Sequence, residues 1–229
     1  MFRHLYNPQI VYFISDQQNN ADFGIQVVLA VFTGLAVFVA LFQEQIKNWF
    51  NRAILDMNIK TSPPDCHQIN LTINNQYVGK AIYTRIKVIH KSGQIAKNVE
   101  IIISKVSKLN RSNKWINVKS FLPMNLKWSH TGGQTVTIPP KSFRHCDLGS
   151  FRQNSLVANF LIDTIVQPNP VSQNKIPNLL TPGTYLFECV LSGENVKPQI
   201  KKWKIFFKPN WSKSEKIMLS KNIKIEEYK

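Results

Sequence analysis

The stretch Gly24-Ile-Gln-Val-Val-Leu-Ala-Val-Phe-Thr-Gly-Leu-Ala-Val-Phe-Val-Ala-Leu-Phe42 decides how this chain is built. Its 19 residues include no charged side chain and no proline. A helix of this length rises about 1.5 Å per residue and matches the hydrocarbon core of a bilayer, which is about 30 Å thick. We therefore predict one transmembrane helix over residues 24–42, preceded by an N-terminal tail over residues 1–23.

The apolar run is expected to stay in the protein as an anchor. A cleaved signal peptide has a short basic region before its apolar segment and small residues at its cleavage site. Here the apolar run starts after 23 residues, and its last residues, Phe38-Val39-Ala40-Leu41-Phe42, have no small-x-small pattern.

Charge on the two sides of the span predicts its orientation. The 229 residues include 29 Lys and Arg against 13 Asp and Glu, which gives a formal net charge of +16. Only Arg3 is basic before the span, whereas Lys47, Arg52 and Lys60 follow it closely. Because Lys and Arg near a span mark its cytoplasmic side, we predict an inner-membrane protein. Its N-terminus would lie outside and its C-terminal domain in the cytoplasm.

Residues 43–60 predict an amphipathic helix that continues the span. Apolar residues recur there on one helical face, and the Pro63-Pro64 pair ends the helix because proline cannot continue it. We interpret residues 61–65 as a linker and residues 66–229 as the following domain.

One face of this long helix is a candidate for self-association. Small and weakly polar residues let two membrane helices approach closely, and apolar residues at 4-3-4 spacing continue the same face after the span. Residues of these types are also common in membrane helices that do not associate, so both interpretations are open. The face comprises Gln26, Ala30, Thr33, Gly34, Ala40, Ile46, Trp49 and Ala53.

From Cys66 onward the sequence changes to short runs of alternating apolar and polar residues, which are typical of β-strands. Residues 82–88 and 99–103 predict a strand, a turn and a returning strand. Residues 185–191 and 203–207 repeat this pattern around a second turn. The run 156–162 fits a helix or a buried strand, and residues 163–182 predict a long loop. Seven or more short strands without a long helix between them predict a mainly β fold, an antiparallel β-sandwich.

Two of these segments resemble a known family. The run Tyr83-Thr-Arg-Ile-Lys-Val-Ile-His-Lys-Ser-Gly-Gln-Ile-Ala-Lys-Asn-Val-Glu-Ile101 resembles the first hairpin of bacterial Ig-like, cell-adhesion-type β-sandwiches. The run Pro182-Gly-Thr-Tyr-Leu-Phe187 resembles the Pro-Gly-x-Tyr strand near the end of such domains. The chain is also similar to bacterial single-pass membrane proteins that carry one Ig-like domain. The resemblance implies an Ig-like fold and no particular reaction.

The sequence contains no recognisable catalytic or cofactor motif. It has no P-loop, Gly-x-Gly-x-x-Gly, Gly-x-Ser-x-Gly or His-Glu-x-x-His. The pairs Cys66-His67 and His145-Cys146 lack the spacing of a zinc site, and neighbours on a strand point to opposite faces. Together with Cys189, these cysteines are too few and too far apart for a disulfide framework, which favours a reducing compartment. We expect no catalytic residue, no metal and no cofactor.

Lysines and aromatic residues gather in the last 30 residues. Such a patch binds nucleic-acid phosphates and stacks bases, attracts anionic lipids, or forms a solvated face that keeps an edge strand from aggregating. The sequence leaves these three interpretations open. The candidate basic surface comprises Lys201, Lys202, Lys204, Lys208, Lys213 and Lys216.

These observations predict a membrane-anchored, non-enzymatic interaction module. Its cytoplasmic β-sandwich would bind a protein partner, and its membrane helix would self-associate into a homo-oligomer. The first alternative is a membrane-attached sensor or effector that binds nucleic acid or an anionic nucleotide through the basic C-terminal region. The second is an extracytoplasmic adhesion-type domain, which requires the opposite orientation.

Overall fold

A computed structural model describes residues 8–50, 52–73, 75–119, 121–154, 157–164, 178–212 and 214–228 of the chain. The chain divides into two compact units, Met1–Phe50 and Asn51–Lys229. Each unit is described by itself below.

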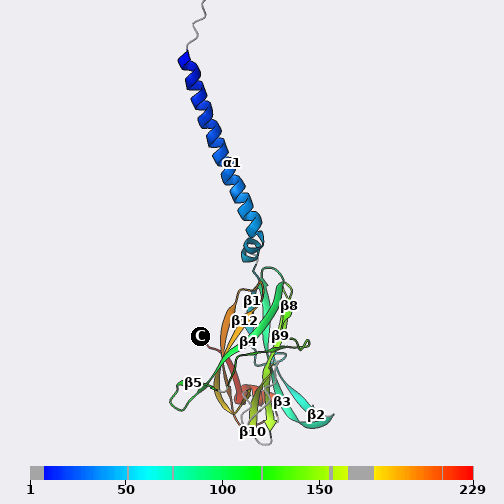
Figure 1. Ribbon diagram of the computed structural model, residues 1–229. Coiled ribbons are helices and arrows are strands. Elements are labelled where there is room, and N and C mark those ends of the chain that lie inside the picture. The colour runs from blue at the N-terminus through cyan, green and yellow to red at the C-terminus, as the bar shows by residue number, and fades with distance from the viewer. Residues whose placement is uncertain are drawn as a thin grey trace, which may run out of the picture. The chain divides into compact units, whose positions relative to one another are not determined.

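The described part of the first unit forms one helix, α1 (Pro8–Phe50) (Figure 1). Its segment Phe23–Gln45 is long and apolar enough to cross a membrane, and it includes the predicted span. Large apolar side chains are exposed all along this segment within the unit, as expected of a helix that is apolar on every side. The helix begins inside the predicted tail. Proline suits its first position, and no glycine or further proline interrupts it before Gly24.

The helix ends at Phe50, so the prediction of a helix over residues 43–60 is wrong beyond that residue. Residues Ile54–Asn58 form the strand β1 instead. Leu55 and Met57 are fully buried, whereas the residues on either side of them are not. Ala53 and Met57, two of the positions that suggested a helical face, also fit the two-residue period of a strand together with Leu55. Pairing of this segment with residues 87–92 stabilises the strand.

Residues 61–65 do not separate the two units, because they lie inside the second one. They connect β1 to β2 (Cys66–Ile73) along the same edge of one sheet, where both strands pair with β3 (Gln76–Ser92). Asp65 is only 2% exposed, and its carboxylate accepts a hydrogen bond from the backbone N–H of Lys60 at 3.1 Å. The segment is therefore a packed connection between strands.

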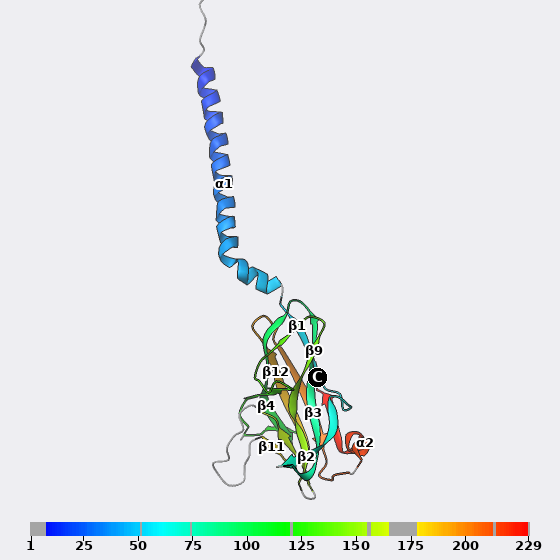
Figure 2. The ribbon, with the colours of Figure 1, turned by 90° about the vertical axis from the view of Figure 1, so that its right-hand side faces the viewer.

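The second unit contains two sheets in which all strand pairs are antiparallel, so the predicted mainly β fold is confirmed (Figures 1 and 2). Sheet I has the strand order β1-β3-β9-β10-β11, with β2 also on β3 and β7 on β9. Within the run 156–162, residues 157–162 form a strand of this sheet, and residue 156 lies outside the described residues. The strands of sheet I that have not yet been given are β7 (Lys127–Trp128), β9 (Phe143–Asn154), β10 (Val157–Ile162) and β11 (Leu179–Leu180).

Sheet II has the order β14-β13-β12-β4-β5, with β6 and β8 also on β4. A short helix, α2 (Glu215–Ile217), and a π-helix, η1 (Met218–Asn222), lie between β13 and β14. Of the predicted loop 163–182, residues 165–177 lie outside the described residues. The strands of sheet II are β4 (Ala96–Leu109), β5 (Trp115–Asn117), β6 (Met124–Asn125), β8 (Val136–Ile138), β12 (Gly183–Ser192), β13 (Gln199–Phe207) and β14 (Ile223–Glu227).

Only one of the two predicted strand–turn–strand pairs is a hairpin. Strands β12 and β13 pair directly, as predicted. Strands β3 and β4 do not pair, because β3 belongs to sheet I and β4 to sheet II. The turn between them carries the chain from one sheet to the other at Gly93. A Cβ atom at Gly93 would lie 2.3 Å from the carbonyl oxygen of Arg52, so only glycine fits this close approach.

The core lies between the two sheets and is centred on aromatic rings. Phe151 and Phe160 come from sheet I, and Phe187 and Phe207 come from sheet II. The Phe160 ring lies 4.5 Å from Phe151 and 5.9 Å from Phe187, measured between ring centroids. Trp128 adds a polar link, because its buried indole N–H donates to the carbonyl oxygen of Val99 at 3.1 Å.

Candidate functional site

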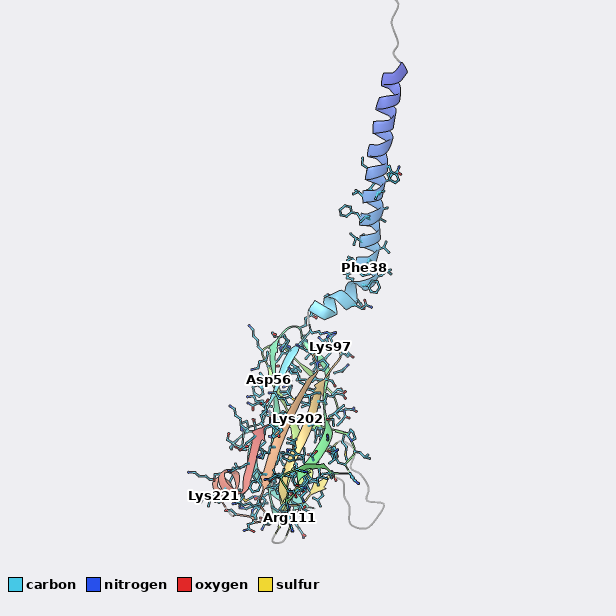
Figure 3. All side chains as sticks on the ribbon, turned by 90° about the vertical axis from the view of Figure 1, so that its left-hand side faces the viewer. Phe38, Asp56, Lys97, Arg111, Lys202 and Lys221 are labelled. Atoms are coloured by element: carbon cyan, nitrogen blue, oxygen red, sulfur yellow. The ribbon has the colours of Figure 1, made fainter. Side chains whose placement is uncertain are left out.

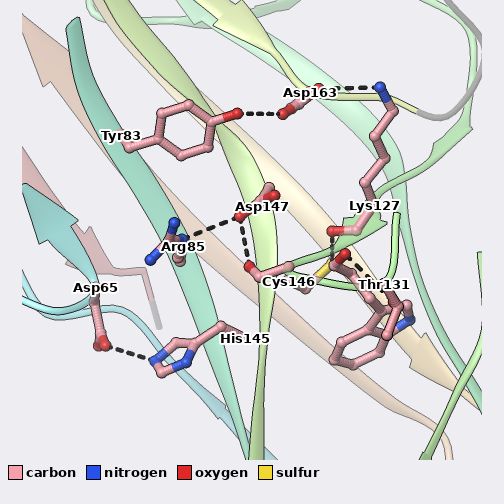
Figure 4. A network of polar contacts seen from close by, with 11 residues as sticks. Asp65, Tyr83, Arg85, Lys127, Thr131, His145, Cys146, Asp147 and Asp163 are labelled. Atoms are coloured by element: carbon pink, nitrogen blue, oxygen red, sulfur yellow. Dashed lines mark hydrogen bonds and ion pairs between the residues drawn. The ribbon is translucent and has the colours of Figure 1, made fainter. Parts of the chain in front are cut away.

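The outer face of sheet I carries a network of paired charges (Figure 4). Arg85 contacts Asp147 at 3.2 Å. Asp163 accepts a hydrogen bond from the Tyr83 hydroxyl at 2.9 Å and pairs with Lys127 at 3.5 Å. Partial burial and the hydrogen bond to Asp163 raise the pKa of Tyr83 well above its usual range, so the phenol remains a donor. These charges neutralise one another, and the network joins strands of sheet I.

The sequence offered no signal for this network. Asp65 lies next to His145 at 3.0 Å, although 80 residues separate them in the chain. Only strand pairing brings the aspartates and their partners onto one face, and sequence spacing does not reveal that pairing.

The two Cys-His pairs stay apart in the structure. Cys66 lies on β2 opposite Thr84, and Cys146 lies on β9 opposite Ile86, so β3 separates them. No cluster of three His, Cys, Asp or Glu side chains suited to a metal ion occurs in the described part of the chain. All three cysteines are buried free thiols, and burial raises the pKa of Cys66 to about 12.

The outer face of sheet II differs because it exposes apolar side chains. An antiparallel sheet with one solvated face usually has polar residues on that face. Here the outward positions of β12 include Leu186 and Val190, both half-buried, and β13 contributes Phe206 and Ile200, of which Ile200 is 62% exposed. Apolar side chains that are not covered by the protein itself are typical of an interaction surface.

A hollow of about 290 Å³ lies at one end of this face. The strand register places Thr184, Phe206 and Lys224 in one row across β12, β13 and β14. The next row contains Leu186, Lys204 and Glu226. We call this hollow the sheet II patch. It is lined by Leu109, Thr184, Lys204, Phe206, Lys224 and Glu226.

An aromatic contact spans the sheet beside the patch. Trp115 lies on β5 and Tyr228 directly follows β14, and these strands are at opposite edges of sheet II. Their ring centroids are nevertheless 5.9 Å apart, with the rings nearly perpendicular. The β4–β5 hairpin and the C-terminus therefore reach toward each other over the outer face, and Figure 1 shows them on the same side of the unit.

The lysines of the predicted basic surface have different roles. Lys201 donates from Nζ to the carbonyl oxygen of Met57 at 2.8 Å and pairs with Asp56 at 2.8 Å. Gln199 donates in the same way to the carbonyl oxygen of Leu55. Since β1 is an edge strand of sheet I, these side chains from sheet II satisfy its free carbonyl groups. Lys201 is thus a link between the sheets.

Replacing Lys201 by methionine is expected to lower the free energy of unfolding by about 1–3 kcal/mol, because a half-buried carboxylate and a carbonyl lose their donor. The charge of Lys201 and its hydrogen bond outweigh burial and lower the pKa of Asp56. This part of the stability is therefore present above about pH 4 and is lost as the pH falls through the folded pKa. Urea unfolding at pH 7 and at pH 3 measures both effects.

Lys202→Met is the matched control for this prediction. Lys202 is on the opposite face of the same strand, 45% exposed, and pairs with Glu188 at 3.3 Å (Figure 3). An exposed pair of this kind contributes at most about 1 kcal/mol. Equal losses in the two variants would contradict the role given to Lys201.

Lys204 remains available on the sheet II patch, together with Lys224. Among the residues that the structure describes, no carboxylate oxygen lies within 4.0 Å of either ammonium group. Lys208 is exposed after the end of β13. Lys216 lines a separate hollow of about 480 Å³ with Pro63. Lys213 lies outside the described residues.

The predicted self-association face is only partly on the helix. Its positions from Gln26 to Ala40 lie on α1, and Ile46 and Trp49 lie there too, with side chains outside the description. The Thr33 hydroxyl donates to the carbonyl oxygen of Leu29 at 2.7 Å, so it is satisfied within the helix. Ala53 does not belong to this face, because it is fully buried in the β-rich unit and bridges to Val196.

The outer face of sheet I thus carries a network of paired charges beside the exposed Phe143 and the half-buried Lys87. The sheet II patch combines apolar side chains with two lysines, and neither lysine has a carboxylate oxygen within 4.0 Å among the described residues. No protein-family model and no curated protein matches this chain.

Proposed function

We propose that this protein is a single-pass membrane protein whose β-sandwich is a non-enzymatic module that binds an acidic surface of a protein partner through the sheet II patch. The observation that carries this proposal is the pair Lys204 and Lys224 beside Phe206, without a carboxylate within 4.0 Å among the described residues. Interfaces combine aromatic anchors with charges that complement the partner. The patch offers both.

The contrast between the two sheets supports the choice of surface. On sheet I, Arg85 and Lys127 are paired with Asp147 and Asp163, so these two cations gain little from a charged partner. On sheet II, the half-buried Leu109 and Phe206 line the same hollow as Lys204 and Lys224, and no salt bridge engages these two lysines among the described residues. Covering those side chains removes apolar surface from water, which favours association.

A protein partner is favoured over nucleic acid by Glu226. This carboxylate lines the same hollow as Lys204 and Lys224, and it would lie close to any phosphate bound between them. Like charges placed together in a binding site oppose binding. A protein surface can pair Glu226 with a basic residue of its own, whereas a phosphate backbone cannot.

The membrane and its orientation are part of the proposal. Support comes from the apolar segment Phe23–Gln45 and from Lys47, Arg52 and Lys60, which follow it, against a single basic residue before it. We place the β-sandwich in the cytoplasm and group it with Ig-like domains, in line with its two antiparallel sheets. Self-association of the span through Gln26 and its neighbours belongs to the same proposal.

Charge reversal tests the patch. The full chain in detergent is titrated with a 20-residue peptide of Glu-Glu-Glu-Glu-Lys repeats, whose lysines can pair with Glu226, and, separately, with a single-stranded oligonucleotide of equal net charge. Lys204→Glu/Lys224→Glu is expected to weaken binding of the peptide about tenfold, which corresponds to about 1.4 kcal/mol. The control Lys97→Glu/Arg144→Glu makes the same change in net charge with exposed residues away from the patch, and we expect at most a twofold effect. Equal effects, or tighter binding of the oligonucleotide, would reject the proposal.

Protease accessibility tests the orientation. The proposal predicts that the β-sandwich is protected in intact cells and digested in inverted membrane vesicles. Digestion in cells with an opened outer envelope, together with protection in the vesicles, would support the extracytoplasmic adhesion-type domain instead.

A further inference from the structure

The hairpin formed by β2 and β3 projects beyond the rest of sheet I (Figure 1). Strand β9 pairs with β3 only over residues 81–89, whereas β2 pairs with β3 out to the turn at residue 76. Residues 70–73 and 76–80 therefore form a two-stranded arm. Near its tip, Tyr77 is 60% exposed and Val78 is 51% exposed.

The other edge strands of the sandwich are protected from pairing with further strands. Side chains of β13 cover the edge of β1. Strand β14 carries Lys224, Glu226 and Glu227, while β5 and β11 have only three and two residues. Charged residues and short strands are the usual means of preventing edge-to-edge association.

Strand β2 and the tip of the arm lack charged residues, and β2 is not a short strand. The 14 residues from Cys66 to Gly79 include no Asp, Glu, Lys or Arg and no proline. Val, Ile, Thr and Tyr are frequent there and favour strands. An exposed and uncharged edge of this kind is a template for pairing with another strand.

Backbone groups on the outer edge of β2 are free to pair. The N–H of Gln68 points away from β3, because it donates to the Glu215 carboxylate at 2.9 Å; Figure 2 shows α2 beside this strand. The pairing of β2 with β3 shifts by one residue between Leu71 and Thr72, and the extra residue, Val78, lies on β3. Strand β2 therefore keeps its alternation, in which alternate residues direct their N–H and C=O groups to the same edge, so Asn70 and Thr72 also present theirs outward. Within the described residues, no hydrogen bond engages their outward backbone groups.

We propose that two copies of this protein pair through the free edges of β2, antiparallel and centred on Leu71. Asn70 of one copy would exchange two hydrogen bonds with Thr72 of the second copy. Thr72 of the first copy would exchange two more with Asn70 of the second. Leu71 would face Leu71 of the second copy at the two-fold axis. A two-fold axis makes the same surface serve both copies.

A second copy fits this edge because the edge is uncharged and can pair with itself about Leu71. Each chain carries a net charge of +16, so two copies repel each other wherever their basic surfaces meet. Residues 66–79 contain no lysine or arginine, so two copies can pair through β2 without placing ammonium groups on the paired strands opposite each other. Anchoring both copies in one membrane would further raise their effective concentration. This inference does not rest on the sheet II patch or on its partner.

Cysteine cross-linking in membranes tests the pairing. Residues that face each other without hydrogen bonds in an antiparallel pair have Cα atoms about 4.5 Å apart, within the range of a disulfide. Leu71→Cys is therefore expected to give a disulfide-linked dimer of the full chain on mild oxidation. The native thiols remain unreactive because they are buried. Glu226→Cys, on the exposed and charged edge of β14, is the matched control and should stay monomeric.

A second variant separates arm pairing from association through the membrane helix. Thr72→Pro removes an outward N–H that β3 does not use, and edge strands tolerate proline at such positions. In the Leu71→Cys background it should abolish the cross-link, and Thr72→Lys should do the same by charge repulsion. Both variants are first shown to keep the melting temperature of the parent chain. Absence of a dimer in Leu71→Cys, an equal dimer in Glu226→Cys, or a dimer that survives both changes at position 72 would overturn the proposal.

Discussion

Phe160→Ala is expected to lower the free energy of unfolding of the β-rich unit by about 3–5 kcal/mol. Phe160 is fully buried and contacts rings from both sheets, Phe151 in sheet I and Phe187 and Phe207 in sheet II. Alanine would remove these contacts and leave a cavity that the surrounding strands cannot fill. Near-UV circular dichroism and urea unfolding measure the loss.

Phe143→Ala is the matched control for Phe160. The Phe143 side chain is 49% exposed on β9, where its ring contacts the Lys87 ammonium group at 4.0 Å. Its removal should cost no more than about 1 kcal/mol, the usual contribution of an exposed cation–π contact. Similar losses for Phe160 and Phe143 would show that the aromatic cluster does not hold the two sheets together.

Two arginines in the apolar segment, Val31→Arg with Leu35→Arg, are expected to release the protein from the membrane. Both residues lie near the middle of the segment Phe23–Gln45. A charged residue at the centre of a span costs about 2.5–3.5 kcal/mol on insertion scales, so the pair costs about twice that amount. Extraction of membranes with alkaline carbonate should then leave the variant in the supernatant and the parent chain in the pellet.

The control for this variant is Gln45→Arg, which adds a positive charge at the C-terminal end of the same segment. An arginine there reaches the polar interface with its long side chain and costs little. The Gln45→Arg variant should therefore remain in the pellet. Release of the parent chain by carbonate would contradict a membrane-spanning role for α1.

Local pattern in the sequence predicted the elements of this fold better than their partners. The apolar run 24–42 and the alternation in residues 185–191 each depend on neighbours along the chain, and both appear in the structure as expected. The path of the chain at Gly93 depends instead on a contact with Arg52. Alternation in 82–88 and 99–103 marks two strands equally well whether they pair or lie in different sheets.

The end of the helix shows the same limit. Between residues 51 and 58, apolar side chains occur at positions that suit both a helix and a strand. The strand is favoured because Leu55 and Met57 reach the core and because β3 pairs with this segment. Neither the core contacts of this segment nor its pairing with β3 can be recognised from residues 51–58 themselves. The sequence therefore did not show that Ala53 lies outside the helix.

The candidate site was predictable only in part. The sequence showed that lysines gather near the C-terminus, but it could not separate Lys201, which is bound to Asp56 and Met57, from Lys204. These two lysines lie on the same strand at positions 201 and 204, and strand geometry places them on opposite faces. Leu109 and Trp115, which come from another part of the chain, join the same face through β4 and β5.

Site-specific photocross-linking in living cells tests the central claim most directly. A photoreactive phenylalanine analogue replaces Phe206 on the sheet II patch or, as the control, Phe143 on the outer face of sheet I. We predict a protein adduct from position 206 that is absent from position 143, resists nuclease and disappears with Lys204→Glu/Lys224→Glu. Equal adducts from both positions, an adduct that nuclease removes, or no adduct from position 206 would contradict a protein-binding role for this face.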